Sequence, residues 1–330
     1  MTTTDLRRRS AAALVARVRR TLRERSLVVP GMRVLAACSG GPDSAAMLCV
    51  LARLAPELRL SVEAASVDHG LRPEAARDVE LARAQAALAG VPFHALRVRV
   101  ERASSLQARA RVARYAALLE LAGRIGAQRV AVGHTQDDQA ETVLLRVLRG
   151  AGLRGLSGIE PLRADGVMRP LIDCRRADVH RYAAEHAPRS AQDQSNAERR
   201  FARVRVRLDL LPAFEREDAA AVQHLSDLAD DARAATEALS MHAEALLEAA
   251  RQPDGSIDVS NWPPASAVRR AALRSWLSRD AGVRVRRPQL AELERAAAAP
   301  AEVWLASGWV VRAHGDGRLR LEHDPATHKA

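Results

Sequence analysis

Short apolar runs alternate with longer amphipathic stretches over roughly the first half of the chain. The short runs predict buried β-strands, and the stretches between them, with apolar residues at helical spacing, predict helices. The predicted strands are residues 34–38, 60–67, 93–100 and 129–132. The predicted helices are residues 5–26, 42–54, 73–90, 105–123 and 136–149. This alternation predicts an α/β fold: a doubly wound, mostly parallel sheet that binds ligands beyond the carboxyl ends of its strands.

The pattern changes in the second half of the chain. Residues 188–200 are polar and rich in turn formers, and they interrupt the alternation. A long alanine-rich helix is then predicted over residues 218–251, and later strands flank a Gly-Asp-Gly turn at 315–317. We therefore expect a catalytic α/β domain at residues 1–215 and a smaller α+β domain at 216–330.

The net charge of the chain indicates what kind of partner it binds. The chain has 51 basic and 40 acidic residues, a net charge of +11, and this excess predicts attraction to a polyanion, most simply nucleic acid. An acidic membrane surface is the competing interpretation. Lys329 is the only lysine, so no lysine is placed to act as a nucleophile or to grip a phosphate.

The cysteine positions and the hydropathy of the chain argue against cysteine-ligated metal sites, disulfide-rich secreted proteins and membrane-spanning proteins. Cys38, Cys49 and Cys174 form no CxxC pair, which argues against a four-cysteine zinc site, an iron–sulfur site and a disulfide framework. We therefore expect a reducing compartment and a cytoplasmic location. Neither a signal peptide nor a run of apolar residues long enough to span a membrane is visible, so no membrane association is expected.

The motif SGGPDS separates the first predicted strand from the next helix. Glycines there let a phosphate approach the backbone, and the N–H groups of the helix start point at the same place. An aspartate would repel phosphate unless a metal ion, Mg²⁺, lay between them. A glycine turn before a capped helix is the simpler alternative, which the full motif disfavours. The candidate ATP-binding residues are Ser39, Gly40, Gly41, Pro42, Asp43 and Ser44.

A second polar motif, GHTQDDQAET, follows the fourth predicted strand. Asp137 and Glu141 are four residues apart and share a helix face, and Asp138 and His134 lie beside them in the sequence. A solvated, acidic helix start is the alternative, and the helix dipole would favour it. The abrupt change from these polar residues to an apolar helix favours a functional site. The candidate catalytic residues are Asp43, His134, Asp137, Asp138 and Glu141.

These motifs resemble those of a known family. SGGxDS is similar to the pyrophosphatase loop (PP-loop) of the ATP-dependent adenylating enzymes, whose fold is the adenine nucleotide alpha hydrolase type. With VDHGLR at 67–72 and GHTQDDQAETVLLRVLRGAG at 133–152, residues 30–215 resemble the short form of tRNA(Ile)-lysidine synthetase. The further matching residues are Arg111, Arg114-Tyr115, Arg169-Pro170-Leu171, Asp193, Ser195-Asn196, Arg203, Arg205, Arg207 and Leu211-Pro212.

The resemblance implies a ligase that joins L-lysine to C2 of the wobble cytidine of tRNA(Ile) with a CAU anticodon. ATP adenylates the base, pyrophosphate leaves, and the lysine amine then displaces AMP to give lysidine. The implied cofactor is Mg²⁺, the implied partner is tRNA(Ile), and the family resemblance favours a homodimer.

Residue roles follow from the resemblance and the local chemistry. We expect Asp137 and Glu141 to bind lysine, while proton removal falls to either His134 or Asp138. The expected tRNA contacts are Arg203, Arg205 and Arg207, with Arg269, Arg270, Arg274 and Arg312 as further candidates. The four tryptophans, Trp262, Trp276, Trp304 and Trp309, are expected in the core of the small domain rather than as base-stacking platforms.

Two other classes compete. A PP-loop tRNA 2-thiolating enzyme shares the loop and the RNA, but it usually needs reactive or cluster-binding cysteines, and Cys38 is predicted to lie in a buried strand. A non-catalytic tRNA-binding protein would carry a decayed loop, whereas both motifs here are intact. An amidotransferase-type synthetase is disfavoured because no glutaminase domain is visible.

Overall fold

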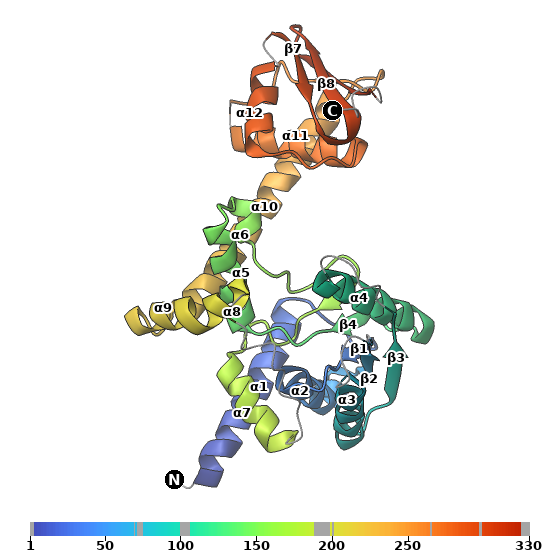
Figure 1. Ribbon diagram of the computed structural model, residues 1–330, viewed down its shortest axis with the longest axis vertical. Coiled ribbons are helices and arrows are strands. Elements are labelled where there is room, and N and C mark those ends of the chain that lie inside the picture. The colour runs from blue at the N-terminus through green and yellow to red at the C-terminus, as the bar shows by residue number, and fades with distance from the viewer. Residues whose placement is uncertain are drawn as a thin grey trace. The chain divides into compact units, whose positions relative to one another are not determined.

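A five-stranded parallel sheet organises the first part of the chain (Figure 1). Its strands are β1 (Arg33–Ala37), β2 (Ser61–Asp68), β3 (Phe93–Arg97), β4 (Arg129–Ala131) and β5 (Val167–Met168). Their order is β3-β2-β1-β4-β5, and all four pairings are parallel. The chain winds outward from β1 to β3 and then crosses to β4 on the other side of β1. The carboxyl ends of β1 and β4 therefore flank the switch point at which such sheets bind ligands.

This computed structural model describes most of the chain. The described residues are 3–68, 70, 75–99, 106–187, 199, 201–264, 266–296 and 299–324. Two compact units are present, Met1–Asp231 and Ala232–Ala330. The predicted boundary near residue 215 lies earlier than this division because the helix that follows it begins by packing on the first unit.

Helices cover both faces of the sheet, while α5 (Gln136–Leu148) and α6 (Leu153–Leu156) lie beyond its edge, where α5 packs against the later helices (Figure 1). The remaining helices before residue 188 are α1 (Thr3–Glu24), α2 (Pro42–Leu58), α3 (Ala75–Ala89), α4 (Leu106–Ile125) and α7 (Arg176–His186). The predicted α/β fold is confirmed, with the first four strands and five helices within a few residues of their expected positions. The two-residue β5 and helix α7 were not predicted.

The core shows why β1 is continuously apolar. Val34 and Ala36 pack on the side of α1, α2 and α7, whereas Leu35 faces α4 on the other side. Successive side chains of a strand point to opposite faces, so a strand covered on both sides is apolar throughout. With only 3% aromatic residues, the layers are filled mainly by Ala, Leu and Val.

A helical segment follows the region of 188–200. It comprises α8 (Ala202–Arg205), a π-helical turn (Val206–Leu210), α9 (Leu211–Glu217) and α10 (Ala221–Ala250). The first part of α10 is tied to the residue that follows α1, Arg25, whose Nη2 donates to Asp173 Oδ1 at 2.7 Å and to Asp230 Oδ2 at 2.6 Å. This ion network holds the start of α10 against the first unit.

The second unit contains an antiparallel sheet. Its elements after α10 are β6 (Ile257–Asp258), α11 (Ser266–Asp280), α12 (Arg287–Ala296), β7 (Pro300–Trp304), a 3-10 turn (Ala306–Gly308), β8 (Trp309–His314) and β9 (Arg318–His323). The strand order is β6-β9-β8-β7, and the predicted Gly-Asp-Gly turn joins β8 to β9. Trp276 is fully buried, and Trp262 and Trp309 pack against the core, as expected. Trp304 is 42% exposed, so its placement in the core was wrong.

Among the described residues, none of the helices combines the length and the apolar character needed to cross a membrane.

Candidate active site

The SGGPDS motif forms an open loop between β1 and α2. Helix α2 begins with Pro42 after Gly41, which provides no side-chain cap. The first N–H groups of a helix have no acceptor within it, and no side chain of the N-cap residue caps those of α2. An uncapped helix start after a glycine turn is a ready site for an anion such as phosphate.

Gly40 allows the loop to pack tightly against α3. Its φ is +79°, and a Cβ at this position would lie 2.9 Å from the backbone oxygen of Asp78. From the same helix, Gln85 Nε2 donates to the carbonyl oxygen of Gly40 at 3.0 Å. Helix α3 therefore fixes the position of the loop, and only glycine fits at its closest point.

The two serines of the loop have different surroundings. Ser44 is buried, and its Oγ donates to the carbonyl of Gly41 at 3.0 Å and accepts from the N–H of Ser39 at 3.1 Å. Ser39 is exposed, with its Oγ 3.3 Å from that of Ser44. Ser44 thus braces the loop from within, while Ser39 stays open to a ligand.

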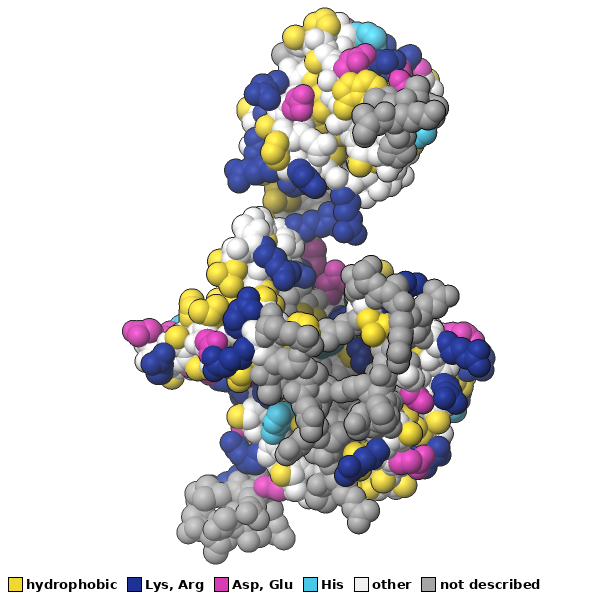
Figure 2. All heavy atoms as spheres, in the orientation of Figure 1, with side chains coloured by type: hydrophobic (Ala, Val, Ile, Leu, Met, Phe, Trp, Pro, Cys, Tyr) yellow, Lys and Arg dark blue, Asp and Glu magenta, His cyan; other side chains and the backbone are white. Residues whose placement is uncertain are grey.

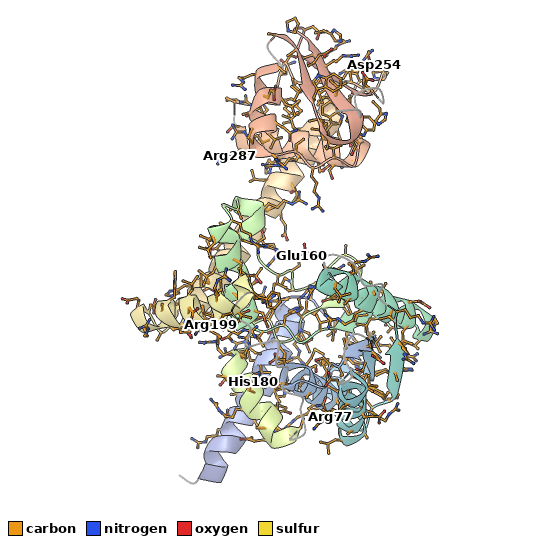
Figure 3. The ribbon with its side chains drawn as sticks, viewed as in Figure 1. Arg77, Glu160, His180, Arg199, Asp254 and Arg287 are labelled. Carbon is orange, nitrogen blue, oxygen red and sulfur yellow. The ribbon has the colours of Figure 1, made fainter. Side chains whose placement is uncertain are left out.

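Asp43 faces an unpredicted neighbour. Its Oδ1 is buried, has no hydrogen bond of good geometry within the described residues, and lies 3.1 Å from Nε2 of His180. His180 is on α7 and is labelled in Figure 3. No group of three or more His, Cys, Asp and Glu suited to a metal occurs in the part of the chain that the structure describes. One carboxylate suits Mg²⁺, which commonly takes one or two protein carboxylates together with substrate phosphates and water.

The second motif touches the first. Gly133 follows β4, and a Cβ there would lie 3.1 Å from the carbonyl carbon of Asp43 and 3.2 Å from the nitrogen of Ser44. The absence of a side chain at Gly133 therefore lets the end of β4 lie against the start of α2. His134 and helix α5 come next in the chain, so the loop and the acidic helix start share the edge of the sheet between β1 and β4.

Unlike α2, helix α5 has a closed start. Thr135 is the N-cap of a capping box, in which its N–H donates to Asp138 Oδ2 at 2.8 Å and its Oγ1 accepts from the N–H of Asp138 at 3.4 Å. The Oγ1 of Thr135 also donates to Asp138 Oδ2 at 2.9 Å. A capping box satisfies the orphan N–H groups of the first turn. The start of α5 is therefore no anion site, and its carboxylates turn toward cations.

Four arginines supply those cations. Arg175 and Arg176 come from the start of α7, Arg203 from α8 and Arg207 from the π-helical turn. They pair with the carboxylates of α5, which are buried. The carboxylates in these pairs are Asp137, Asp138 and Glu141. Sequence analysis missed Arg175 and Arg176, since no local pattern distinguishes them from surface arginines, and it assigned Arg203 and Arg207 to RNA.

The surroundings of the two candidate bases, His134 and Asp138, lower the pKa of both. Burial by itself would raise the pKa of Asp138, but Arg176, Arg203, His134 and the N–H of Thr135 lower it to about 2. Burial, helped by Arg169, Arg111 and Arg203, lowers the pKa of His134 to about 3. Both groups are weak bases in this arrangement, and the choice between them stays a prediction.

The low pKa of His134 predicts a pH-dependent stability. Because the unfolded state takes up this proton near pH 6.5 and the folded state only near 3, stability falls as the pH drops between those values. The loss from this group is about 1.4 kcal/mol per pH unit. A His134→Asn variant, which has no proton to take up, should show a flatter decline between pH 6.5 and 5 in urea unfolding. Parallel declines for both proteins would contradict this expectation.

The remaining predicted contacts lie elsewhere. Arg205 is exposed and donates to the carbonyl oxygen of Arg199 at 3.0 Å. In the second unit, Arg269 and Arg270 pair with Glu294. Arg312 there pairs with Glu302 and Glu322. The matching residues His69, Leu71, Arg72, Asp193, Ser195 and Asn196 fall outside the described residues.

The cysteines are poorly suited to sulfur chemistry. Cys38 and Cys174 are buried, and burial raises the pKa of each thiol to about 12. The thiolate is the reactive form of cysteine, and these thiols stay protonated at neutral pH. The structure thus weakens the thiolation alternative.

Comparison with known proteins agrees with the geometry. A family described as the PP-loop domain matches residues 12–214. The tRNA(Ile)-lysidine synthase of Salinispora arenicola is 41% identical over 280 residues, covering 82% of this chain and 83% of that protein. The chain belongs to the tRNA(Ile)-lysidine synthase family. The family member of Mycolicibacterium paratuberculosis is 43% identical over 243 residues, with 73% of each chain covered.

Other relatives match only part of their own length, or share only the fold. The family member of Symbiobacterium thermophilum is 42% identical over 226 residues, covering 66% of this chain but only 47% of that longer protein. Among solved structures, the U34-tRNA thiolase NcsA from Methanococcus maripaludis aligns with a TM-score of 0.57 at 16% identity. The alignment covers 67% of this chain and 79% of the thiolase, and it shows a shared fold.

Proposed function

We propose that the protein ligates L-lysine to C2 of the wobble cytidine of tRNA(Ile), using ATP and releasing AMP and pyrophosphate. Membership of the tRNA(Ile)-lysidine synthase family supports this reaction. One structural observation carries the proposal for this chain: the uncapped start of α2 and the acidic start of α5 meet through Gly133. An anion site and a cation site thus lie side by side.

The two sites suit the two halves of the reaction. Cytidine O2 attacks the α-phosphate of ATP, the bond to the β-phosphate breaks, and pyrophosphate leaves toward the loop of Gly40 and Gly41. The lysine ε-amine then attacks C2, loses a proton, and AMP departs with the former O2. Donors fixed around the pyrophosphate stabilise the charge that develops on it as it leaves.

Asp43 is the residue of the loop that would hold Mg²⁺, through the buried Oδ1 beside His180. When bound there, the ion would neutralise charge on the phosphate oxygens. The expected homodimer and cytoplasmic location stay predictions.

Asp137 is the lysine-binding residue that can be tested most simply. It retains an unfilled acceptor position, since its three hydrogen bonds come from the backbone N–H of Arg176 and from two side-chain N–H groups of Arg175. Asp137→Asn keeps the shape and removes the charge, so we expect lysine incorporation to fall by about 100-fold, the scale of a lost charged contact in a buried site. The affinity for tRNA, measured by filter binding, should change little. An equal loss of both would contradict this role.

The RNA partner accounts for the excess of positive charge. Arginine side chains are spread over the surface of each unit (Figure 2), and guanidinium groups bind phosphates and stack on exposed bases. Arg203, Arg205 and Arg207 remain candidates for RNA contacts. For Arg203 and Arg207 the carboxylates of α5 compete with that role.

The proposed reaction is tested directly by mass analysis of tRNA(Ile) incubated with the protein, ATP and lysine. Addition of one lysine residue with loss of water, confined to the wobble cytidine, is the expected product. Release of pyrophosphate should require the tRNA. Unmodified tRNA together with intact ATP would contradict the proposal, and a mass gain from a sulfur donor instead of lysine would support the thiolation alternative.

A further inference from the structure

The deepest carboxylate of the site, Glu141, is fully buried and is occupied by three arginines. Its Oε1 accepts from Arg176 Nη1 at 2.8 Å and from Arg207 Nε at 2.7 Å. Its Oε2 accepts from Arg203 Nε at 2.9 Å and from Arg207 Nη2 at 3.1 Å. A carboxylate offers about four lone-pair positions, so Glu141 has none left for another donor.

Asp138 is filled in the same way. Its Oδ2 accepts two hydrogen bonds from Thr135, one from the N–H and one from Oγ1. Its Oδ1 accepts from Nη2 of Arg176 and from Nη2 of Arg203, both at 2.9 Å. Of the three carboxylates at the start of α5, two are therefore saturated by groups of the protein itself.

The charges of the cluster lead to the same conclusion. Three carboxylates of α5 face four guanidinium groups, and Glu215 adds a fourth carboxylate beside Arg175. The cluster carries no net negative charge that would attract an ammonium group. A guanidinium also fits a carboxylate through two N–H groups, which a lysine ammonium cannot match. Lysine can reach Glu141 only where an arginine withdraws.

Of the three arginines that hold Glu141, Arg203 and Arg207 are more exposed than Arg176 and can withdraw more easily. The side chain of Arg176 is 17% exposed, whereas those of Arg207 and Arg203 are 25% and 41% exposed. Arg203 lies on α8 and Arg207 on the π-helical turn, and both elements are beside α5 (Figure 1). Single π-helical turns often occur at functional sites.

The anchoring of this turn is one-sided. Val204 and Val206 are buried, whereas Leu208 and Leu210 are exposed. A short segment held on one face by two valines and by ion pairs can shift its arginines when another anion competes for them. RNA phosphates are such anions, and they bind arginine through the same paired N–H groups as carboxylates do.

We propose that Arg203 and Arg207 occupy the lysine site of the free protein and leave it when tRNA phosphates bind them. This inference rests on the proposed function. Their departure breaks four hydrogen bonds to Glu141 and Asp138, which vacates more acceptor positions than the three donors of a lysine ammonium require. The two arginines thus determine the order of binding: lysine enters after the tRNA. The site then exposes its negative charge only when the acceptor of the lysine is present.

Lysine binding without ATP tests the inference in the absence of turnover. Equilibrium dialysis of radiolabelled lysine against the full chain is compared with and without saturating tRNA(Ile). We expect lysine to bind about tenfold more tightly, or better, when the tRNA is present, which corresponds to about 1.4 kcal/mol of coupling. Equal affinities in the two states would overturn the inference, whatever the behaviour of any variant.

Variants separate the arginines from a general effect of RNA. Arg203→Met with Arg207→Met should bind lysine without tRNA about tenfold more tightly than the unaltered chain does. Arg216→Met is the matched control, because it removes the same charge from an exposed position of the adjoining helix α9, where Arg216 Nε donates to the carbonyl oxygen of Pro212, and it should bind lysine as the unaltered chain does. If the double variant fails to fold, Arg203→Met alone, the more exposed site, replaces it. Unchanged lysine affinity in a folded variant contradicts the inference.

The failure of this inference can be distinguished from the failure of the proposed function. Lysidine formation on tRNA(Ile) is measured separately with the unaltered chain. A chain that makes lysidine but binds lysine equally with and without tRNA contradicts only the order of binding. A chain that makes no lysidine contradicts the proposed function itself.

Discussion

Replacing Glu141 with alanine is expected to lower the free energy of unfolding of the first unit by roughly 3–5 kcal/mol, the range found when one partner of a buried ion pair is removed. Glu141 is fully buried and accepts hydrogen bonds from three arginines. Its loss leaves guanidinium groups facing one another without a counter-charge. Their mutual repulsion and incomplete solvation destabilise the packing of α5 against α7 and α8.

The two units can be followed separately in this experiment. All four tryptophans lie beyond Asp231, so tryptophan fluorescence reports on the second unit, whereas circular dichroism reports on the helices of both. Urea unfolding of Glu141→Ala should shift the circular dichroism transition to lower urea and leave most of the fluorescence transition in place. Adding Arg203→Met and Arg207→Met should restore part of the loss, because the uncompensated charges are then removed as well.

A surface carboxylate provides the control. Glu57 pairs with Arg19 and Arg23 and is partly exposed, and Glu57→Ala should cost less than about 1 kcal/mol, as is usual for surface ion pairs. A similarly small effect for Glu141→Ala would show that the arginine cluster contributes little to stability.

Replacing Gly40 with alanine is expected to reduce tRNA-dependent pyrophosphate release by about 100-fold, the scale of a small misplacement of reacting groups. The added Cβ would lie 2.9 Å from the backbone oxygen of Asp78, which cannot move without α3. The loop must therefore shift away from α3, and its N–H groups with it. Pyrophosphate is measured with ATP, lysine and tRNA(Ile), and binding of the tRNA should be retained.

Gly31→Ala is the matched control for the backbone conformation. Gly31 also has a positive φ, +89°, but a Cβ there would meet no atom within 4 Å. Both substitutions carry the strain of a left-handed backbone, about 1–2 kcal/mol, while only the change at Gly40 displaces the loop. Equal activities of the two variants would show that the close contact with α3 does not position the loop.

Sequence analysis located the elements that local patterns specify. Strand β1 is apolar because both faces of the sheet are covered there, and the helices between the strands carry apolar residues at helical spacing. The two-residue β5 is too short to show any period, so it was missed together with α7. The division of the units inside α10 was also out of reach, because a continuous helix gives no sign of where its packing partners change.

Sequence patterns likewise located only part of the candidate site. The pattern of residues 39–44 and 133–142 places the loop and the acidic helix start, because strand ends, glycines and helix caps depend on residues near one another in the chain. The partners of the acidic residues depend on the tertiary structure. Arg176 and Arg207 contact Glu141 although they lie 35 and 66 residues away in the sequence. His180 lies beside Asp43, and it belongs to α7, a helix that the sequence pattern did not predict.

The sequence by itself therefore determined the α/β fold, the glycine loop before α2 and the family, since these rest on short-range patterns and on their spacing. Only the tertiary structure decided which cations face Asp137, Asp138 and Glu141. In a chain with 51 basic residues, any of them could pair with a carboxylate until folding removes water and selects by distance and burial. That selection brought arginines assigned to RNA into the site expected for lysine.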